Sequence, residues 1–264
     1  MIDGKQVTVC FHVDDLLVTS KLKTNVDQVI NELETKFNEI TVTRGVKHSY
    51  LSMNIVQSAS KLEIDMIGYV KKITVDVKAD LRRMCPANDD LFNIDSSSTP
   101  LSNEDRESFH TKVAQLLYLA KRARLDLLTA VSHLAGRVSC PNEDENRKLS
   151  HVLSYLVNTR ERKMILKSTG ATMEFVCYID ASYGGEDDAT SRSGVIIYVC
   201  GVALLGWSPK QKLIVKSACE SEIVALSDGL SHVLWVRNLM KEQYRDTDDM
   251  EPTVVIRIIR MLYH

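Results

Sequence analysis

The spacing of apolar residues changes twice along this chain of 264 residues. Short β-branched and aromatic runs occupy the first third, apolar residues at helical spacing occupy the middle, and alternation appears in the last third. A strand with a period of two and a helix with a period of 3.6 place different side chains on one face. The pattern therefore predicts a mixed α/β (α+β) fold, with a helical segment between two segments that contain strands.

The composition is that of a folded, globular chain. Apolar residues make up 44% and charged residues 26%, with five Pro and eleven Gly, which excludes disordered and collagen-like classes. The six cysteines show no CxxC spacing, so we expect free or buried thiols rather than disulfides or a zinc site.

Neither a leader nor a membrane span is predicted. The first ten residues contain Asp3 and Lys5 and no apolar run, so we expect no signal peptide. The longest apolar run, 194–207, is shorter than the ~20 residues that a bilayer requires. The cytoplasm is the default expectation for location, without a membrane partner.

A stretch rich in helix-breaking residues divides the chain. Residues 85–101 contain Pro86, Pro100 and a Ser-Ser-Ser-Thr run, which is typical of a linker. We predict three parts, at 1–95, 96–170 and 171–264.

Local patterns predict the elements of each part. For the first part they are a hairpin of strands 7–12 and 16–19, a helix at 25–37, strands at 50–56 and 62–65, and a helix at 71–84. Helices dominate from 104 to about 167, with one near 146–159. The last part should contain a strand at 174–180, a hairpin of 193–200 and 202–207, a helix at 219–241 and a strand at 253–259.

Two pairs of acidic residues could bind metal. Asp14 and Asp15 are adjacent at the predicted hairpin tip, where their mutual repulsion favours a cation. Asp180 ends a predicted strand and Glu222 lies in the first turns of the following helix, so the two can meet if that helix packs on the strand. The alternatives are an acidic turn for the first pair, and for the second a turn-forming Asp and a Glu placed favourably at a helix N-terminus beside Glu220.

Positive charge is concentrated in the middle of the chain. Residues 101–170 hold 12 basic and 8 acidic groups, whereas both flanking segments are net negative. Such a cluster can hold a phosphate backbone, and the alternative is a solvated helical face. The candidate nucleic-acid contacts are Lys121, Arg122, Arg124, Arg160, Arg162 and Lys163.

An ordered set of motifs spans about residues 7–256. The motifs are His12-Val13-Asp14-Asp15-Leu16-Leu17, the segment 50–55, Thr99-Pro100-Leu101, 116–120, Arg124-Leu125-Asp126, Tyr178-Ile179-Asp180-Ala181, Ser191-Arg192-Ser193-Gly194, 207–211 and 220–227. Taken together, they resemble the Pol polyprotein of copia-type LTR retrotransposons, at the join between reverse transcriptase and ribonuclease H.

This resemblance implies a function for each part. The first part would be a remnant of the polymerase palm with a primer-grip-like hairpin, the second a thumb-like helical region, and the third a ribonuclease H-like domain. Asp14 and Asp15 would be a polymerase metal pair, and Asp180 and Glu222 two of four acidic nuclease ligands for Mg²⁺ or Mn²⁺. The implied partners are an RNA–DNA hybrid or template–primer duplex and the remainder of the Pol polyprotein.

The departures from the family pattern set the expected activity. Only thirteen residues precede Asp14, His12 stands where the family has an aromatic residue, and no acid follows Glu251 in the tail 257–264. Ser52, Asn54 and Leu125 also replace usual family residues. We therefore expect an incomplete C-terminal domain, no polymerase activity and little or no nuclease activity in the isolated chain. The alternatives are a non-catalytic nucleic-acid-binding protein and a transposon remnant without function.

Overall fold

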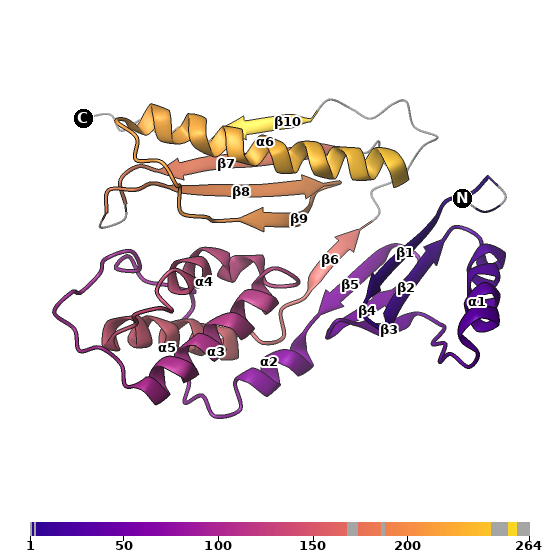
Figure 1. Ribbon diagram of the computed structural model, residues 1–264, viewed down its shortest axis with the longest axis horizontal. Coiled ribbons are helices and arrows are strands. Elements are labelled where there is room, and N and C mark those ends of the chain that lie inside the picture. The colour runs from indigo at the N-terminus through magenta and orange to yellow at the C-terminus, as the bar shows by residue number, and fades with distance from the viewer. Residues whose placement is uncertain (1, 3, 168–173, 186–187, 244–252, 258–264) are drawn as a thin grey trace.

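The computed structural model describes residues 2, 4–167, 174–185, 188–243 and 253–257. These residues form six α-helices, one 3-10 turn and ten strands in three sheets, so the predicted mixed fold is confirmed. In Figure 1 a sheet covered by α6 lies above a layer formed by α3, α4 and α5, and the N-terminal strands and α1 lie beside this helical layer. The division into three functional parts stays a prediction.

The N-terminal hairpin forms as predicted. Strand β1 (Val7–His12) pairs antiparallel with β2 (Asp15–Ser20), and His12 lies opposite Asp15. Val13 and Asp14 are left as the turn, with Val13 at a φ of 55°. Helix α1 (Lys23–Phe37) follows and contacts β2.

The second sheet corrects two predictions. Its order is β3 (Lys47–Tyr50), β4 (Met53–Gln57), β5 (Lys61–Asp65) and β6 (Met164–Lys167). A single strand over 50–56 was wrong, because Leu51 and Ser52, at φ values of 50° and 64°, form a tight turn between β3 and β4. Helical structure up to 167 was also wrong, since β6 pairs with β5 across about a hundred residues of sequence.

Helix α2 (Ile67–Ile73) begins and ends earlier than the predicted helix at 71–84, which was wrong. Its C-cap is Thr74, whose Oγ1 donates to the Val70 carbonyl oxygen at 2.7 Å. Thr74, Val75 and Val77 are β-branched, and such side chains lose rotamer freedom in a helix. The local sequence therefore gives little support to a longer helix.

The middle of the chain contains α3 (Asn103–Ala120), the 3-10 turn η1 (Leu125–Leu127), α4 (Leu128–Ala135) and α5 (Glu143–Asn158). Asn142 and Glu145 form a capping box at the start of α5, which satisfies backbone N–H groups that would otherwise have no partner. These elements enclose the larger hydrophobic core, whose least exposed members are Leu116, Leu119, Ala120, Leu127, Val131, Leu134, Val152 and Leu156.

The last sheet has the order β10-β7-β8-β9. It consists of β7 (Phe175–Ser182), β8 (Arg192–Val199), β9 (Val202–Trp207) and β10 (Val254–Arg257), which runs parallel to β7. The predicted hairpin is confirmed, with Cys200 and Gly201 both at positive φ in its turn. Residues 258 and 259 of the predicted final strand, and the tail after them, lie outside the described residues.

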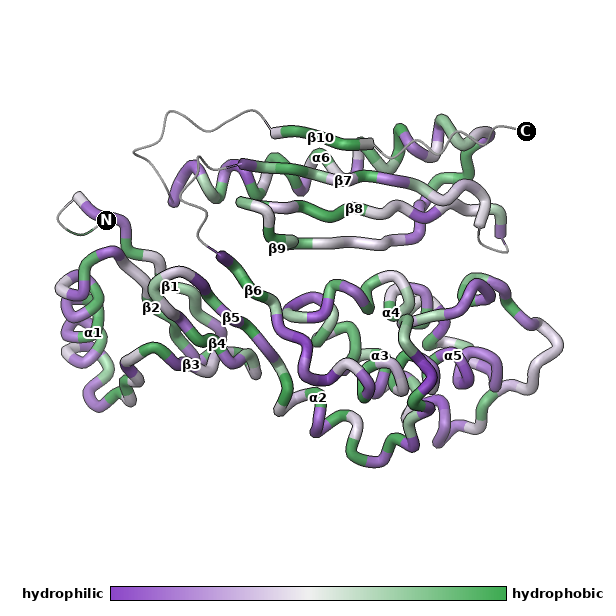
Figure 2. Tube along the Cα trace, turned by 180° about the vertical axis from the view of Figure 1, so that it is seen from behind, coloured by the Kyte–Doolittle hydropathy of each residue, from purple (hydrophilic) through white to green (hydrophobic). Residues whose placement is uncertain are grey.

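Helix α6 (Ala218–Gln243) covers one face of this sheet. Phe175, Cys177 and Ile179 of β7 are buried in the second hydrophobic core, which also contains helix residues such as Ala225 and Val233. Figure 2, viewed from behind, shows β7, β8 and β9 from the side opposite to α6. In the described part of the chain, no helix is long and apolar enough to cross a membrane.

Candidate metal-binding acids and basic surface

The first acidic pair lies at the tip of the β1–β2 hairpin, as predicted. Asp14 is the second turn residue and Asp15 is the first residue of β2. Both residues are exposed, so their carboxylates keep their hydration and remain accessible to a cation. Within the described ranges, no group of three or more His, Cys, Asp or Glu residues is placed to bind one metal ion.

Asp180 lies in β7 opposite Gly194 of β8, two residues before β7 ends. Ile179 lies against the α6 side of the sheet, because its Cδ1 atom would be 2.8 Å from a Cβ built on Gly229. Successive side chains in a strand point to opposite faces. Asp180 therefore belongs to the exposed face and presents its carboxylate to solvent.

Glu222 lies in the first turns of α6, and its Oε2 atom is buried. Its neighbour Ser221 is fully buried, whereas Glu220 is exposed. Glu220 accepts a hydrogen bond from the backbone N–H of Lys216 at 2.8 Å, and its own N–H donates to Ser217 Oγ at 3.2 Å. Glu220 therefore helps to cap the helix.

Gln211 connects α6, which carries Glu222, to β8, the strand that pairs with the Asp180 strand β7. Its Nε2 atom donates to Ser193 Oγ at 3.0 Å and to the Ser221 carbonyl oxygen at 2.8 Å. Ser193 pairs with Ala181, the residue after Asp180, and Ser221 precedes Glu222. Asp180 and Glu222 therefore lie at the same end of the sheet, on packed elements. From the sequence alone, Gln211 is recognisable only as the last residue of the 207–211 motif.

Arg192 forms a second buried connection at this end of the sheet. Its Nη1 donates to the Ser208 carbonyl oxygen at 2.7 Å and to Ser132 Oγ of α4 at 3.2 Å. The guanidinium also lies 5.3 Å from the centre of the Phe92 ring. Because Arg192 is 6% exposed, these internal partners stabilise its charge and connect the sheet to the helical layer.

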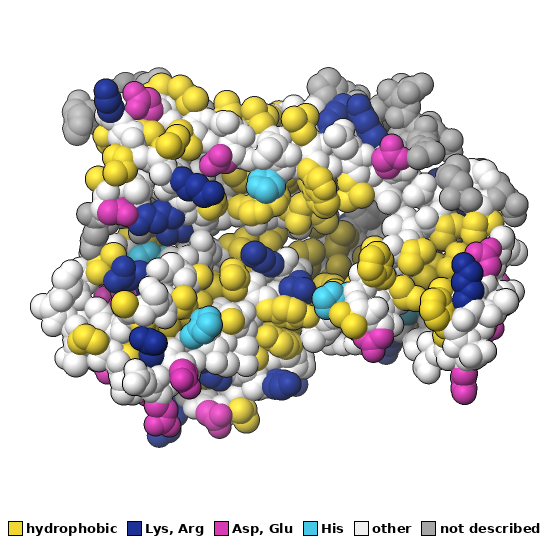
Figure 3. All heavy atoms as spheres, viewed as in Figure 1, with side chains coloured by type: hydrophobic (Ala, Val, Ile, Leu, Met, Phe, Trp, Pro, Cys, Tyr) yellow, Lys and Arg dark blue, Asp and Glu magenta, His cyan; other side chains and the backbone are white. Residues whose placement is uncertain are grey.

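The six basic candidates differ in exposure. Lys121, Arg160, Arg162 and Lys163 are exposed, and Arg122 is half-buried with its guanidinium 3.6 Å from the centre of the Tyr118 ring. The Lys163 ammonium lies 3.1 Å from Glu63, which raises the pKa of that lysine. Figure 3 shows Lys and Arg side chains distributed over the lower layer, beside a hollow that separates it from the upper one.

Arg124 differs from the other five because only 4% of its side chain is exposed. Its Nε and Nη2 donate to the two oxygens of Asp126, and Nη1 and Nη2 also donate to the backbone oxygen and Oγ1 of Thr159. These bonds connect η1 to the end of α5. In the structure the charge of Arg124 is paired internally with Asp126. A phosphate contact for Arg124 stays a prediction.

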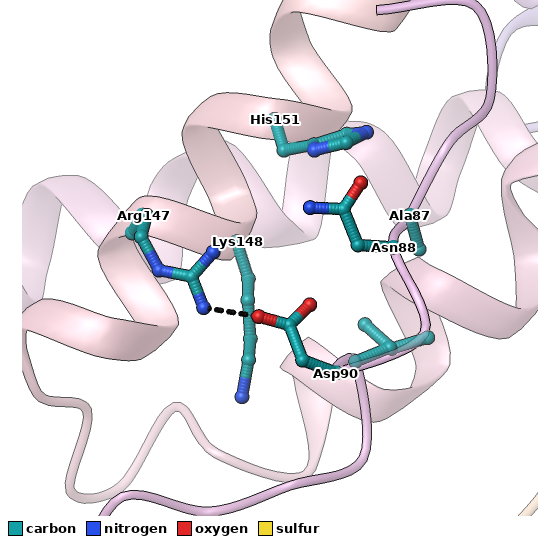
Figure 4. A pocket seen from close by; sticks show the side chains of 7 residues that line it. Ala87, Asn88, Asp90, Arg147, Lys148 and His151 are labelled. Atoms are coloured by element: carbon teal, nitrogen blue, oxygen red, sulfur yellow. Dashed lines mark hydrogen bonds and ion pairs between the residues drawn. The ribbon is translucent and has the colours of Figure 1, made fainter.

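A small pocket lies between the linker and α5 (Figure 4). Two of its cations already have carboxylate partners: Arg147 lies 2.7 Å from Asp90, and Lys148 lies 2.7 Å from Asp144. Such ion pairs offset the positive charge that would attract an anion. We therefore assign this pocket to the packing of the linker. Its lining residues are Ala87, Asn88, Asp90, Leu91, Arg147, Lys148 and His151.

No family model matches the chain. The amino-acid sequence of this chain is similar to the sequences of transposon polyproteins. The chain is 28% identical over 248 residues to the retrovirus-related Pol polyprotein from transposon RE1 of Arabidopsis thaliana, covering 90% of this chain and 16% of that protein. It is 24% identical over 247 residues to the transposon Ty1-MR1 Gag-Pol polyprotein of Saccharomyces cerevisiae, covering 87% of this chain and 14% of that protein.

The predicted resemblance to retrotransposon Pol polyproteins is thus confirmed over most of the chain. The retrovirus-related Pol polyprotein from transposon RE2 of Arabidopsis thaliana matches at 28% identity over 238 residues. The chain spans about a seventh of the length of these relatives. Its similarity therefore indicates a Pol-related role and concerns one segment of such polyproteins.

Proposed function

We propose that this chain is a ribonuclease H-like unit joined to the C-terminal part of a reverse transcriptase, and that it binds RNA–DNA hybrids. The observation that carries the proposal is the placement of Asp180 and Glu222 at one end of the sheet, where Gln211 joins α6 to β8, the strand paired with β7. The similarity to Pol polyproteins over most of the chain supports it.

The donor atoms of this pair are suited to Mg²⁺ or Mn²⁺, because carboxylate oxygens are hard ligands. Asp180 offers its carboxylate from the face of β7 opposite α6, and Glu222 offers the second from the first turns of α6, so a cation held by both would lie at the end of the sheet where these elements meet. A cation held by the pair would polarise a phosphate oxygen and lower the pKa of an attacking water. Two metal ions ~4 Å apart need more acids than two, so we propose that this pair alone supports little hydrolysis.

Hybrid binding is proposed to use the exposed cations that follow α5. Arg160, Arg162 and Lys163 occupy the connection from α5 to β6, and Lys121 follows α3. Phosphate contacts of this kind supply affinity without sequence specificity. A hybrid is distinguished by its helical shape and by the 2′-OH groups of its RNA strand.

A polymerase-type role is proposed for the other acidic pair. Asp14 and Asp15 project from a hairpin tip, where adjacent exposed carboxylates can share a divalent cation with the phosphates of a template–primer duplex. The experiment is Mn²⁺ binding by Asp14→Asn and Asp15→Asn chains. We expect each to lose a weak site, and equal binding by all chains would contradict the proposal.

The main experiment compares four chains on a labelled RNA–DNA hybrid with Mg²⁺ or Mn²⁺. They are the parent, Asp180→Asn, Glu222→Gln and the control Glu220→Gln, which removes a charge two residues away on the same helix. We expect all four to bind the hybrid. We also expect any slow cleavage by the parent and the control to fall at least about tenfold in the other two.

Two results would contradict the proposal. The first is absence of hybrid binding by the parent at low salt. The second is cleavage that is equal in all four chains, because the reaction would then not depend on Asp180 or Glu222. Rapid cleavage by the parent that both substitutions abolish would support the site but overturn the proposed weakness of the pair.

A further inference from the structure

We infer that Gln211 is a positioning residue that holds the start of α6, and with it Glu222, in place against β7 and β8. This inference rests on the proposed function, since it concerns the same pair of acids. Gln211 lies between β9 and α6 and is 3% exposed. Buried polar side chains are found where they have specific partners.

The backbone around Gln211 is fixed to the edge of β8. The N–H of Gln211 donates to the Ser191 carbonyl oxygen at 2.8 Å, and the N–H of Ser193 donates to the Pro209 carbonyl oxygen at 2.9 Å. Arg192 and Lys210 form an isolated antiparallel bridge between these two bonds. These hydrogen bonds therefore fix the backbone position from which the Gln211 side chain extends.

The orientation of the Gln211 amide is determined by chemistry. A backbone carbonyl oxygen only accepts hydrogen bonds, so the group facing Ser221 must be the NH₂ group. The Oε1 atom of Gln211 is buried and has no hydrogen-bond partner among the described residues. Both hydrogen bonds of this side chain are therefore made by its NH₂ group.

These donors couple α6, which carries Glu222, to β8, the strand that pairs with the Asp180 strand β7. Ser221, Ala225 and Gly229 of α6 face the sheet. Because Glu222 directly follows Ser221, any shift of the helix start would also move Glu222. Mg²⁺ requires near-ideal ligand geometry, which makes its binding sensitive to small displacements of a carboxylate. Residues that orient ligands typically matter for metal affinity although they do not touch the metal.

The experiment uses the full chain and compares Gln211→Met and Gln211→Glu with the parent. Both variants keep a long side chain but lose the amide donors. The control is Ser132→Ala, which removes a hydrogen bond to the Ser208 carbonyl oxygen and the acceptor of one from Arg192, and leaves both hydrogen bonds of the Gln211 amide in place. Mn²⁺ binding is measured by electron paramagnetic resonance, amide exchange of 218–224 by mass spectrometry, and stability by thermal melting.

We expect both Gln211 variants to bind Mn²⁺ about tenfold more weakly than the parent. Amide exchange at the start of α6 should rise about tenfold, because a tie between the helix and the sheet is lost. Ser132→Ala should lower the melting temperature but leave both quantities within about twofold of the parent. If Gln211→Met does not fold, Ser193→Ala, which removes one of the two acceptors, should show a smaller change in the same direction.

Unchanged exchange and unchanged Mn²⁺ affinity in the Gln211 variants would overturn the inference. So would equal effects in Ser132→Ala, because the changes would then reflect general loss of stability. A separate result would show that Asp180 and Glu222 do not bind the metal: Mn²⁺ affinity would be the same in the parent, Asp180→Asn and Glu222→Gln. In that case the amide exchange alone decides whether Gln211 holds the helix.

Discussion

The Oη atom of Tyr155 donates a 2.7 Å hydrogen bond to Oδ2 of Asp126, the same carboxylate that pairs with Arg124. Arg162 in turn donates to Tyr155 Oη at 2.7 Å. These four side chains connect the 3-10 turn η1, helix α5 and the segment that leads to β6. Two residues predicted to contact nucleic acid, Arg124 and Arg162, therefore also have a structural role.

Asp126→Asn should destabilise the fold by about 3 kcal/mol, because the nearly buried Arg124 guanidinium loses its charged partner. Urea unfolding followed by circular dichroism measures the change. The control is Asp76→Asn, a charge removal at an exposed position. A loss below about 0.5 kcal/mol, the range of ordinary surface substitutions, would show that the pair contributes little.

Stability should fall in acid. Hydrogen bonds from Arg82 lower the pKa of Asp80 to about 2, and hydrogen bonds from Lys210 and Thr190 lower the pKa of Asp188 to about 2. Burial acts to raise the pKa of Asp126, but its bonds and attraction to Arg124, together with Tyr155 and Arg162, outweigh burial and lower it.

The direction of this pH dependence follows from the pKa of Asp in the unfolded chain, which is ~3.9. Because each pKa is lower in the folded chain, the stabilisation is complete above about pH 4 and is lost as the pH falls toward 2. Melting temperatures between pH 6 and pH 2 measure this loss. Asp188→Asn should make the dependence shallower, and a melting temperature that is constant from pH 5 to pH 2 would contradict the assignment.

Gly229→Val should destabilise the sheet–helix core by about 1–3 kcal/mol through overpacking. A Cβ at this position would lie 2.8 Å from Ile179 Cδ1 and 3.2 Å from Val195 Cγ2. Gly68→Ala in α2 is the control, because a Cβ there meets no atom within 4 Å. Urea unfolding compares both with the parent, and a Gly229→Val chain of parental stability would refute the close packing.

Arg160→Gln and Lys121→Gln should weaken hybrid binding and make it less sensitive to salt. If each residue contacts one phosphate, the log–log slope with salt should decrease by about 0.9 per substitution, the value for B-DNA. Fluorescence anisotropy between 50 and 200 mM salt, roughly the range in which such contacts weaken, measures the slope. Arg82→Gln, an exposed cation in the segment after α2, is the control, and identical slopes in all chains would exclude these contacts.

Cys177 should react with iodoacetamide far more slowly than the exposed Cys140 and Cys219. Burial raises the pKa of the Cys177 thiol to about 11, so little reactive thiolate forms at pH 8. Mass spectrometry of peptides after timed labelling measures the rates, with urea-unfolded chain as the control. Equal rates in the folded chain would mean that β7 is not packed as described.

Much of the fold could be predicted because its elements are locally encoded. The helix at 219–241 and the hairpin around Gly201 have clear periods and a turn residue, and both lie within two residues of the predicted bounds. The turn at Leu51 and Ser52 was missed because both residues adopt positive φ, whereas two-residue hairpin turns of this kind usually contain Gly, Asn or Asp. Strand β6 was missed because its partner β5 is distant in sequence.

The sequence by itself determined the period of each segment, the hairpin that carries Asp14 and Asp15, and the residues with carboxylate or cationic chemistry. Only the tertiary structure decided which of these side chains share a site and which are internal. It placed Asp180 and Glu222 at one end of a sheet through Gln211, and it buried Arg124 against Asp126. The reason is physical: periodicity is a property of neighbouring residues, whereas burial and pairing depend on contacts between segments far apart in the chain.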